Sequence, residues 1–151
     1  MSTNSEQRLQ DALNALPREV MPQRDLWPGI AHALINTGEW SSLGQAEGGR
    51  DWTLGIADPH QADRLITRLR MRGGCVATSA DDQCSFSADR VHHHILNPDT
   101  GYSPTHWSSV TVIAPSCVLA DALTKVLALT RQTALPCFAH FGAQAFITPH
   151  A

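Results

Sequence analysis

Apolar and polar residues alternate in several short runs between residues 51 and 149, a pattern typical of β-strands with one buried face. The clearest run covers residues 64–74, where apolar side chains occupy odd positions and most arginines occupy even positions. The two sets are Leu65, Leu69 and Met71 on one face and Arg68, Arg70 and Arg72 on the other. We therefore predict a strand that ends at Gly73-Gly74 and turns its arginines to solvent.

Other segments combine apolar or β-branched residues with turn formers at their ends. They are 30–40, closed by Gly38, then 51–59, 75–79, 90–101, 108–115 and 141–149. We predict short strands in these segments, and a turn over residues 97–101.

Residues 117–130 show the period of a helix instead. Ser116 is a suitable N-cap, and the apolar positions form one stripe. The predicted buried stripe is Leu119, Leu123, Val126 and Leu127. Short strands with one main helix, without regular alternation, favour a mixed α/β (α+β) layered fold with a mixed sheet.

Residues 1–30 differ from the rest of the chain. Leu9, Leu13 and Leu16 have the spacing of a short amphipathic helix that ends before Pro17. The segment after it is rich in proline and predicts an extended arm. We therefore divide the chain into an N-terminal helix and arm, residues 1–30, and a folded region, residues 31–151.

Composition narrows the possible partners and the compartment. Hydrophobic residues make up 42% of the 151 residues and the net charge is −3, which argues against disorder and against nucleic acid or an anionic membrane as the main partner. No apolar run reaches the length of a membrane span, and no signal peptide or lipobox precedes the fold, so the chain as written is expected in the cytoplasm. The four cysteines lack metal-site spacing and are predicted to be reduced and mostly buried.

Three consecutive histidines, residues 92–94, raise the question of a metal site. Neighbouring side chains on a strand point to opposite faces, so His92 and His94 would share a face. No nearby cysteine or carboxylate completes a tetrahedral set around them. The residues themselves therefore do not favour a zinc site.

Four segments occur in a specific order: CVATSADD, HHILNPDTGY, SVTVIAPSC and ADALTK. Together they resemble the A-T-S-G, H-H-I-x-D-P-x-T-G, S-V-T-V-x-A-P and A-D-A-L-x-T elements of the ApbE-type FAD:protein FMN transferase family. INTGEW and DWTLGIADP are similar to two further segments of that family. The resemblance covers about residues 31–151 and corresponds to the C-terminal half of the family domain, so it implies a T-fold-like half-domain.

The resemblance implies an enzyme that moves FMN from FAD onto a Thr or Ser hydroxyl of an acceptor protein, with Mg²⁺ assistance and release of AMP. The implied partners are FAD and an acceptor protein of a flavin-dependent electron-transfer complex; relatives are usually exported. Two alternatives stay open: a catalytically inactive remnant, or an FAD-binding half-module completed by a partner chain. Because a half-domain leaves a strand edge and an apolar face uncovered, a homodimer or poor solubility is also expected.

By the same resemblance, Thr78 and Ser79 contact the flavin or its phosphates, and His94 and Ile95 lie next to FAD. Asp121 corresponds to a Mg²⁺ ligand of the family, and Thr124, one residue before the position of the second family ligand, is the predicted second ligand; this predicts FAD binding that depends on Mg²⁺ and on Asp121. No catalytic residue is assigned. From the residues alone, Thr78 and Ser79 could equally be polar residues at a strand end.

Three residues depart from the family pattern. Ala80 replaces a glycine, Asn97 replaces an aspartate, and Lys125 stands four residues after Asp121 where the family has threonine. Positions three and four residues apart face each other on a helix. Two alternatives follow: Thr124 supplies the missing hydroxyl to a metal, or Lys125 places its ammonium beside Asp121 in the metal's role.

Overall fold

The computed structural model describes residues 7, 11, 15 and 30–150. The helix and proline-rich arm predicted for residues 1–30 lie almost entirely outside the described residues, so that part of the prediction is untested. The fold described below is built within the compact unit Ala31–Ala151.

Within the described residues, seven strands form two sheets. The strands are β1 (Ala33–Asn36), β2 (Trp40–Leu43), β3 (Trp52–Ala57), β4 (Leu65–Met71), β5 (Gly73–Ala80), β6 (Trp107–Ala114) and β7 (Gln144–Pro149). The larger sheet has the order β1-β2-β5-β6-β7, and β3 pairs with β4 in a second sheet of two strands. The helical elements are η2 (Glu47–Gly49), α2 (Cys117–Thr130), η3 (Arg131–Ala134) and α3 (Leu135–His140).

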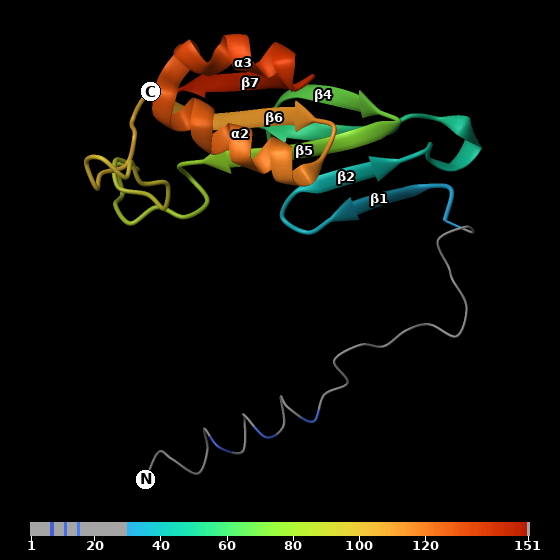
Figure 1. Cartoon of the computed structure of the whole chain (residues 1–151), viewed down its shortest axis with the longest axis horizontal. Helices are drawn as coiled ribbons and strands as arrows, with labels where there is room; N and C mark the ends of the chain where they lie inside the picture. The colour runs from blue at the N-terminus through green and yellow to red at the C-terminus, as the bar shows by residue number, and fades with distance from the viewer. Residues whose placement is uncertain (1–6, 8–10, 12–14, 16–29, 151) are drawn as a thin grey trace. The chain divides into compact units, whose positions relative to one another are not determined.

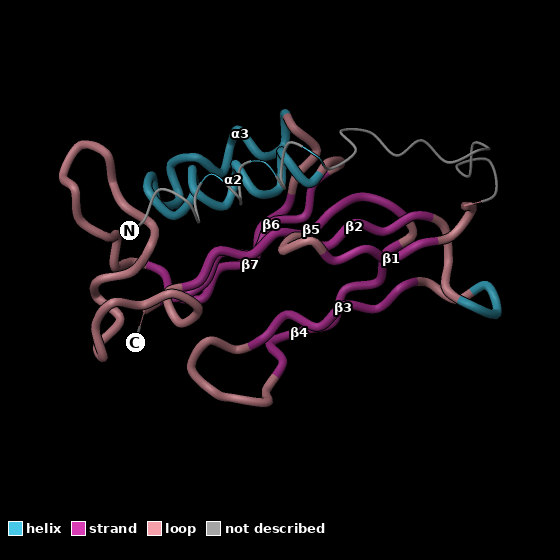
Figure 2. Tube along the Cα trace, turned by 90° about the horizontal axis from the view of Figure 1, so that it is seen from below, coloured by secondary structure: helices cyan, strands magenta, loops and turns pink. Residues whose placement is uncertain are grey.

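The elements stack in three layers. In Figure 2 the helices α2 and α3 cover one face of the five-stranded sheet, and the β3–β4 pair lies on its other side. Figure 1 shows α2 running along β5 and β6, the two central strands of the larger sheet. The α/β layered fold class is therefore confirmed, but every described strand pair is antiparallel where a mixed sheet was predicted. The turn at Gly38, the loop 81–106 and the helical connection 115–143 each bring the chain back antiparallel to the strand before it.

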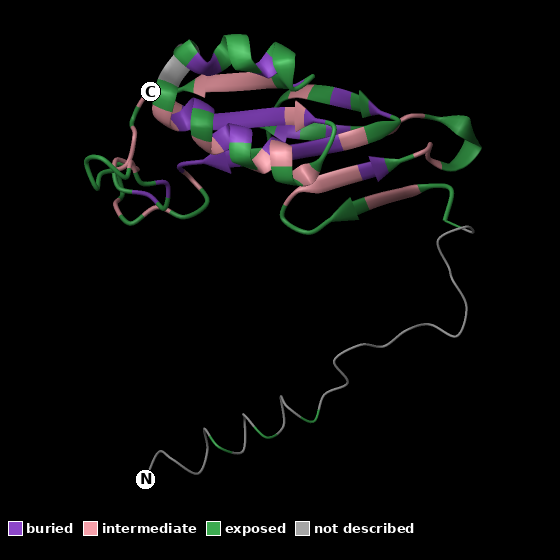
Figure 3. Cartoon of the chain, in the orientation of Figure 1, coloured by how far each residue is buried: buried purple, intermediate pink, exposed green. Residues whose placement is uncertain are grey.

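Alternation along β5 and β6 divides the apolar residues into two cores. One core lies between the larger sheet and the helices; its members include Ala77, Val110, Val112, Leu123 and Leu127. The other lies between the opposite face of the sheet and the β3–β4 pair; its members are Leu54, Ile56, Leu69, Met71 and Val76. Figure 3 shows the central strands and the inner side of α2 as the most buried elements. Each of these two strands is thus covered on both faces, which explains why neither contains a charged residue.

Helix α2 begins as predicted. The backbone N–H of Leu119 donates to Ser116 Oγ at 3.4 Å, so Ser116 caps the helix. The predicted stripe needs one correction: Leu123 and Leu127 are buried, but Val126 is exposed. The buried face is instead completed by Ala120, Thr124 and Ala128. Small side chains let the helix approach the sheet closely, and the hydroxyl of Thr124 finds a partner there.

The strand predicted over residues 90–101 is wrong. This segment belongs to the loop between β5 and β6, where its one strand-like contact is an isolated bridge between Ser85 and His93. Its backbone groups bond to other parts of the same loop: His94 N–H donates to Cys84 O at 3.1 Å and His93 N–H donates to Ser103 Oγ at 2.9 Å. One backbone and one side-chain acceptor within the loop therefore replace a strand ladder.

Two elements lie outside the predicted pattern. The segment 30–40 contains a hairpin turn, and β2 follows it as a separate strand. Gly38 has a φ of 104° and its N–H donates to Asn36 Oδ1 at 3.1 Å, so this turn uses a conformation that suits glycine. Helix α3 also lies outside the pattern; its six residues are too few for a clear period.

The four cysteines are all free thiols, as predicted, but they are not mostly buried. Cys75 is buried and Cys117 is partly buried, while Cys84 and Cys137 are exposed. The two exposed cysteines lie in a loop and on the short helix α3, where few neighbours cover a side chain.

Candidate functional site

A cleft of about 280 Å³ lies between β3 and the face of the larger sheet that is turned away from α2. Its lining comes from five stretches of chain: Gly38 and Trp40, residues within 54–59 at β3 and its end, Leu69 of β4, residues within 76–83 at β5 and its end, and Ser109 with Thr111 of β6. Drug-sized ligands occupy about 300–1,000 Å³, so this cleft has room for part of a large ligand such as a dinucleotide.

Thr78 and Thr111 place two hydroxyl groups in the cleft. The residues are register partners on β5 and β6, and their Oγ1 atoms are 2.8 Å apart. Thr111 is buried and Thr78 is exposed, so Thr78 carries the hydroxyl that a ligand can reach. A hydroxyl keeps unused hydrogen-bonding capacity after one such bond, which suits it to hold a polar group of a ligand.

Ser79 lies on the opposite face of β5, under α2. Its Oγ is 2.7 Å from Thr124 Oγ1, and both side chains are buried. Thr124 Oγ1 already donates its proton to the carbonyl oxygen of Asp121 at 2.7 Å. Ser79 must therefore donate to Thr124, because a hydroxyl has one proton. The assignment of Thr78 and Ser79 to one ligand stays a prediction, but strand alternation separates them.

The side chains of Asp121 and Thr124, the predicted metal ligands, already have other partners. The carboxylate of Asp121 is half-exposed and forms an ion pair with the ammonium of Lys125. Thr124 Oγ1 is fully buried on the sheet side of α2. No group of three His, Cys, Asp or Glu residues that could hold a metal ion occurs among the described residues. As placed, this pair does not fit a Mg²⁺ ion, which needs several convergent oxygens.

His94 and Ile95 lie in the loop between β5 and β6 and are not among the residues that line the cleft. His94 is exposed, so its ring is free to meet a ligand, whereas Ile95 is buried in the core under α2. His93, between the exposed His92 and His94, is buried and its Nε2 donates to Pro104 O at 2.9 Å. Of the three consecutive histidines, the middle one is therefore buried and bonded within the loop, and the two beside it are exposed. The flavin contacts of His94 and Ile95 stay predictions.

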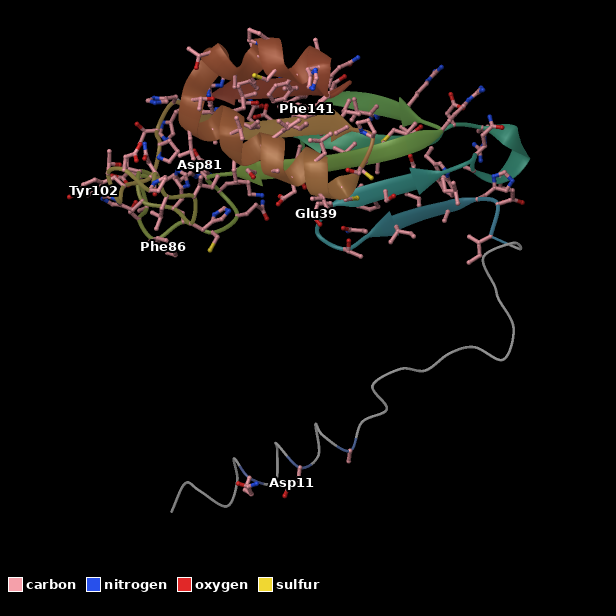
Figure 4. All side chains as sticks on the ribbon, viewed as in Figure 1. Asp11, Glu39, Asp81, Phe86, Tyr102 and Phe141 are labelled. Atoms are coloured by element: carbon pink, nitrogen blue, oxygen red, sulfur yellow. The ribbon has the colours of Figure 1, made fainter. Side chains whose placement is uncertain are left out.

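Asp81 is a buried acidic residue beyond the end of β5 that sequence reasoning missed. It follows β5 directly, and Figure 4 shows it where the chain enters the loop that carries Phe86 and Tyr102. Its carboxylate is 1% exposed; Oδ1 lies 3.6 Å from Arg90 Nη1 and Oδ2 lies 3.5 Å from His150 Nε2. The two adjacent acids after the strand were the available signal, but the sequence does not show which of them turns inward.

Comparison with known proteins shows which family this fold belongs to. The model of the ApbE family matches residues 26–147. The chain belongs to the ApbE family. Among solved structures, the ApbE protein of Thermotoga maritima has 31% identity and a TM-score of 0.69, over 78% of this chain and 40% of that protein. The flavin transferase ApbE of Vibrio cholerae, at 24% identity and a TM-score of 0.55, covers 74% of this chain and 36% of its own length and shows the shared fold.

This ApbE chain therefore spans well under two thirds of the length of these two relatives. A search of curated proteins found no match. Among the described residues, no helix combines the length and apolar character needed to cross a membrane.

Proposed function

We propose that this ApbE-family chain binds FAD and takes part in protein flavinylation. In that reaction FMN moves from FAD onto a Thr or Ser hydroxyl of an acceptor protein belonging to a flavin-dependent electron-transfer complex. Family membership supports the flavin chemistry, and the name of the Vibrio relative, a flavin transferase, agrees with it.

The observation that carries the proposal is the composition of the cleft. Four of the segments that resemble the family contribute to its walls: residues 38–40, 54–59, 76–83 and 109–111. These segments are far apart in the sequence and meet because the β3–β4 pair packs on the larger sheet. Because these segments line one pocket, a single ligand accounts for the family-like motif in each of them.

The proposed transfer forms a bond between the acceptor hydroxyl oxygen and the phosphorus of the FMN half. The bond from that phosphorus to the bridging oxygen of FAD breaks, AMP leaves and the hydroxyl loses its proton. Within this chain, the cleft holds one part of FAD, and the Thr78 hydroxyl bonds to a polar group of that part. Such positioning is a large part of catalysis in phosphoryl transfer.

The Mg²⁺ assistance that the family resemblance implies does not fit the Asp121–Thr124 pair, so we derive no step through a metal. The positive charge beside Asp121 is supplied by Lys125. FAD binding without a requirement for Mg²⁺ is consistent with this ion pair.

A second candidate function is an FAD-binding half-module that a partner chain or a second copy completes. The size of the cleft favours it, since about 280 Å³ holds part of FAD and leaves the remainder to contacts elsewhere. A chain that binds FAD in this way but transfers no FMN would be the catalytically inactive alternative.

Titration of FAD fluorescence with the purified chain, with and without Mg²⁺, tests the proposal. Thr78→Val removes the cleft hydroxyl while keeping the shape, and we expect FAD binding about twofold to tenfold weaker. Thr105→Val, an exposed change in the loop, is the matched control and should leave the affinity unchanged. If FAD does not bind in the presence of Mg²⁺ and does not bind in its absence, both candidate functions are ruled out.

Incubation with FAD and a Thr-containing acceptor protein then separates the two candidates. Covalent flavin fluorescence on the acceptor in a denaturing gel supports transfer. Reversible FAD binding without a fluorescent acceptor band supports the half-module. The same result is expected when the incubation is repeated with an equimolar amount of an added ApbE relative.

A further inference from the structure

The outer face of the β3–β4 pair carries a row of arginines that the proposed function does not use. We call Arg50, Arg68, Arg70 and Arg72 the arginine face. Alternation along β4 buries Leu69 and Met71 and leaves Arg68 and Arg70 exposed, and Arg72, directly after the strand, is exposed too. The residues opposite them on β3 are small: Thr53 pairs with Arg70 and Gly55 pairs with Arg68. No bulky neighbour on β3 therefore covers the guanidinium groups.

The charge of this face is only partly compensated. Asp51 accepts from Arg72 Nε at 2.5 Å and from Gln45 Nε2 at 3.3 Å. The bond from Arg72 lowers the pKa of the Asp51 carboxyl, so this pair stays charged near neutral pH. Within the described part of the chain, neither Arg68 nor Arg70 forms an ion pair. Four of the chain's eleven lysines and arginines thus gather on one face of a protein with net charge −3.

A groove of about 550 Å³ runs beside this face. Its lining is Ala46, Gly49, Arg50, Asp51, Trp52, Thr53, Arg70 and Arg72. The backbone amides at its rim are already bonded: Ala46 N–H donates to Arg50 O at 2.8 Å and Gly49 N–H donates to Ala46 O at 3.2 Å. A compact anion such as phosphate prefers convergent free amides. The groove instead offers side-chain guanidinium groups spread along a strand.

The spacing of the arginines selects an extended ligand. Positions 68 and 70 of β4 are two residues apart, about 6.6–6.8 Å on a strand, and Arg72 follows the strand directly. Alternate side chains of an extended peptide have the same spacing. Among the described strands, β4 pairs with β3 alone, so its other backbone edge has no strand partner. An added strand would gain backbone hydrogen bonds at this edge while its alternate side chains meet the arginines.

We propose that the arginine face binds an acidic, extended segment of a partner protein, with carboxylates at alternate positions. Guanidinium and carboxylate groups form paired, charge-assisted hydrogen bonds, which gives the recognition its chemistry. The proposal does not depend on flavin binding, since the arginine face and the cleft have different lining residues.

Fluorescence anisotropy with labelled peptides tests this. A peptide with alternating Glu and Ser is expected to bind, more weakly as salt rises. A peptide of the same composition with its glutamates in one block should bind at least several-fold less tightly. Arg70→Gln should weaken binding of the alternating peptide about twofold to fivefold. Arg64→Gln is the matched control: Arg64 precedes β4, pairs with Asp58 and should change nothing.

A charge exchange provides the sharpest test. Arg68→Glu with Arg70→Glu should abolish binding of the alternating Glu peptide and create binding of an alternating Lys peptide. Both residues are exposed, and an unchanged thermal unfolding curve verifies the fold. Equal binding of the two glutamate peptides, full displacement by inorganic phosphate, or no peptide binding would each overturn the proposal.

Discussion

Thr78 and Ser79 are adjacent in the chain, yet their hydroxyl groups serve different parts of the molecule. Thr78 opens into the cleft between the two sheets, while Ser79 bonds to Thr124 beneath α2. At residue scale, the A-T-S element of the family pattern therefore has one position available to a ligand and one that holds a helix. The motif alone does not distinguish these roles, because both residues carry the same functional group.

The Ser79–Thr124 hydrogen bond should stabilise the contact between α2 and β5. Thr124→Val leaves the buried Ser79 donor without an acceptor, so we expect a loss of about 1–3 kcal/mol in the free energy of unfolding. Ser79→Ala should cost less, since Thr124 still donates to Asp121 O. In urea denaturation the double variant should lose less than the sum of the two single changes. Strict additivity would contradict the bond.

The ion pair between Asp121 and Lys125 leads to a prediction about how FAD affinity depends on Mg²⁺. This prediction rests on the proposed flavin binding. With Lys125 in place, FAD affinity should not change when Mg²⁺ is added. Lys125→Thr removes the ammonium and frees the Asp121 carboxylate, so this variant should gain Mg²⁺ affinity, measured by calorimetry without FAD. Lys125→Met removes the charge without adding an oxygen and is the control. Tenfold tighter FAD binding by the unmodified chain in Mg²⁺ would show that a metal displaces Lys125.

At the scale of elements, periodicity predicted α2 with its correct bounds and most of the strands. The predicted buried face of α2 was partly wrong. Val126 was expected to be buried, but Ala120, Thr124 and Ala128 are buried and Val126 is exposed. Hydrophobicity favours the larger apolar side chain, but close packing against a flat sheet favours small ones. The failed strand at residues 90–101 has a related cause, since side chains within the loop satisfy its backbone.

Cysteine reactivity should follow the element on which each thiol lies. Burial at the start of α2, with Cys75 beside it, raises the pKa of the Cys117 thiol to about 11. At pH 8 the thiolate is the reactive form, and a pKa of that size leaves about one thiol in a thousand ionised. Iodoacetamide labelling followed by mass spectrometry should therefore modify Cys84 and Cys137 first. Labelling of Cys117 should accelerate as the pH rises toward 11; equal rates for all four at pH 8 would contradict its burial.

At the scale of the whole molecule, apolar side chains remain on the outer surface of the helices. Val118 on α2 is 83% exposed, and Leu135 and Phe141 are also exposed. The larger sheet ends in β1 and β7, each with one strand neighbour among the described strands. Exposed apolar groups and strand edges favour association with other chains.

We therefore expect the purified chain to self-associate, as a concentration-dependent mass in size-exclusion chromatography with light scattering. Val118→Lys should lower the associated fraction without destabilising the fold, because this side chain has little packing to lose. Thr105→Lys is a control that adds the same charge at an exposed loop position. A monomer at every concentration, with cooperative unfolding, would contradict the expectation.

The sequence by itself determined the layered α/β class, α2 with its Ser116 cap, the outward arginines of β4 and the family resemblance. These features depend on local periodicity and on short motifs, which are readable one segment at a time. The tertiary structure decided which hydroxyl of the A-T-S element reaches the cleft, that Asp81 is buried between Arg90 and His150, and that Lys125 holds Asp121. Those outcomes depend on which residues meet across strands, helices and loops, and contacts between distant segments leave no periodic signal in the chain.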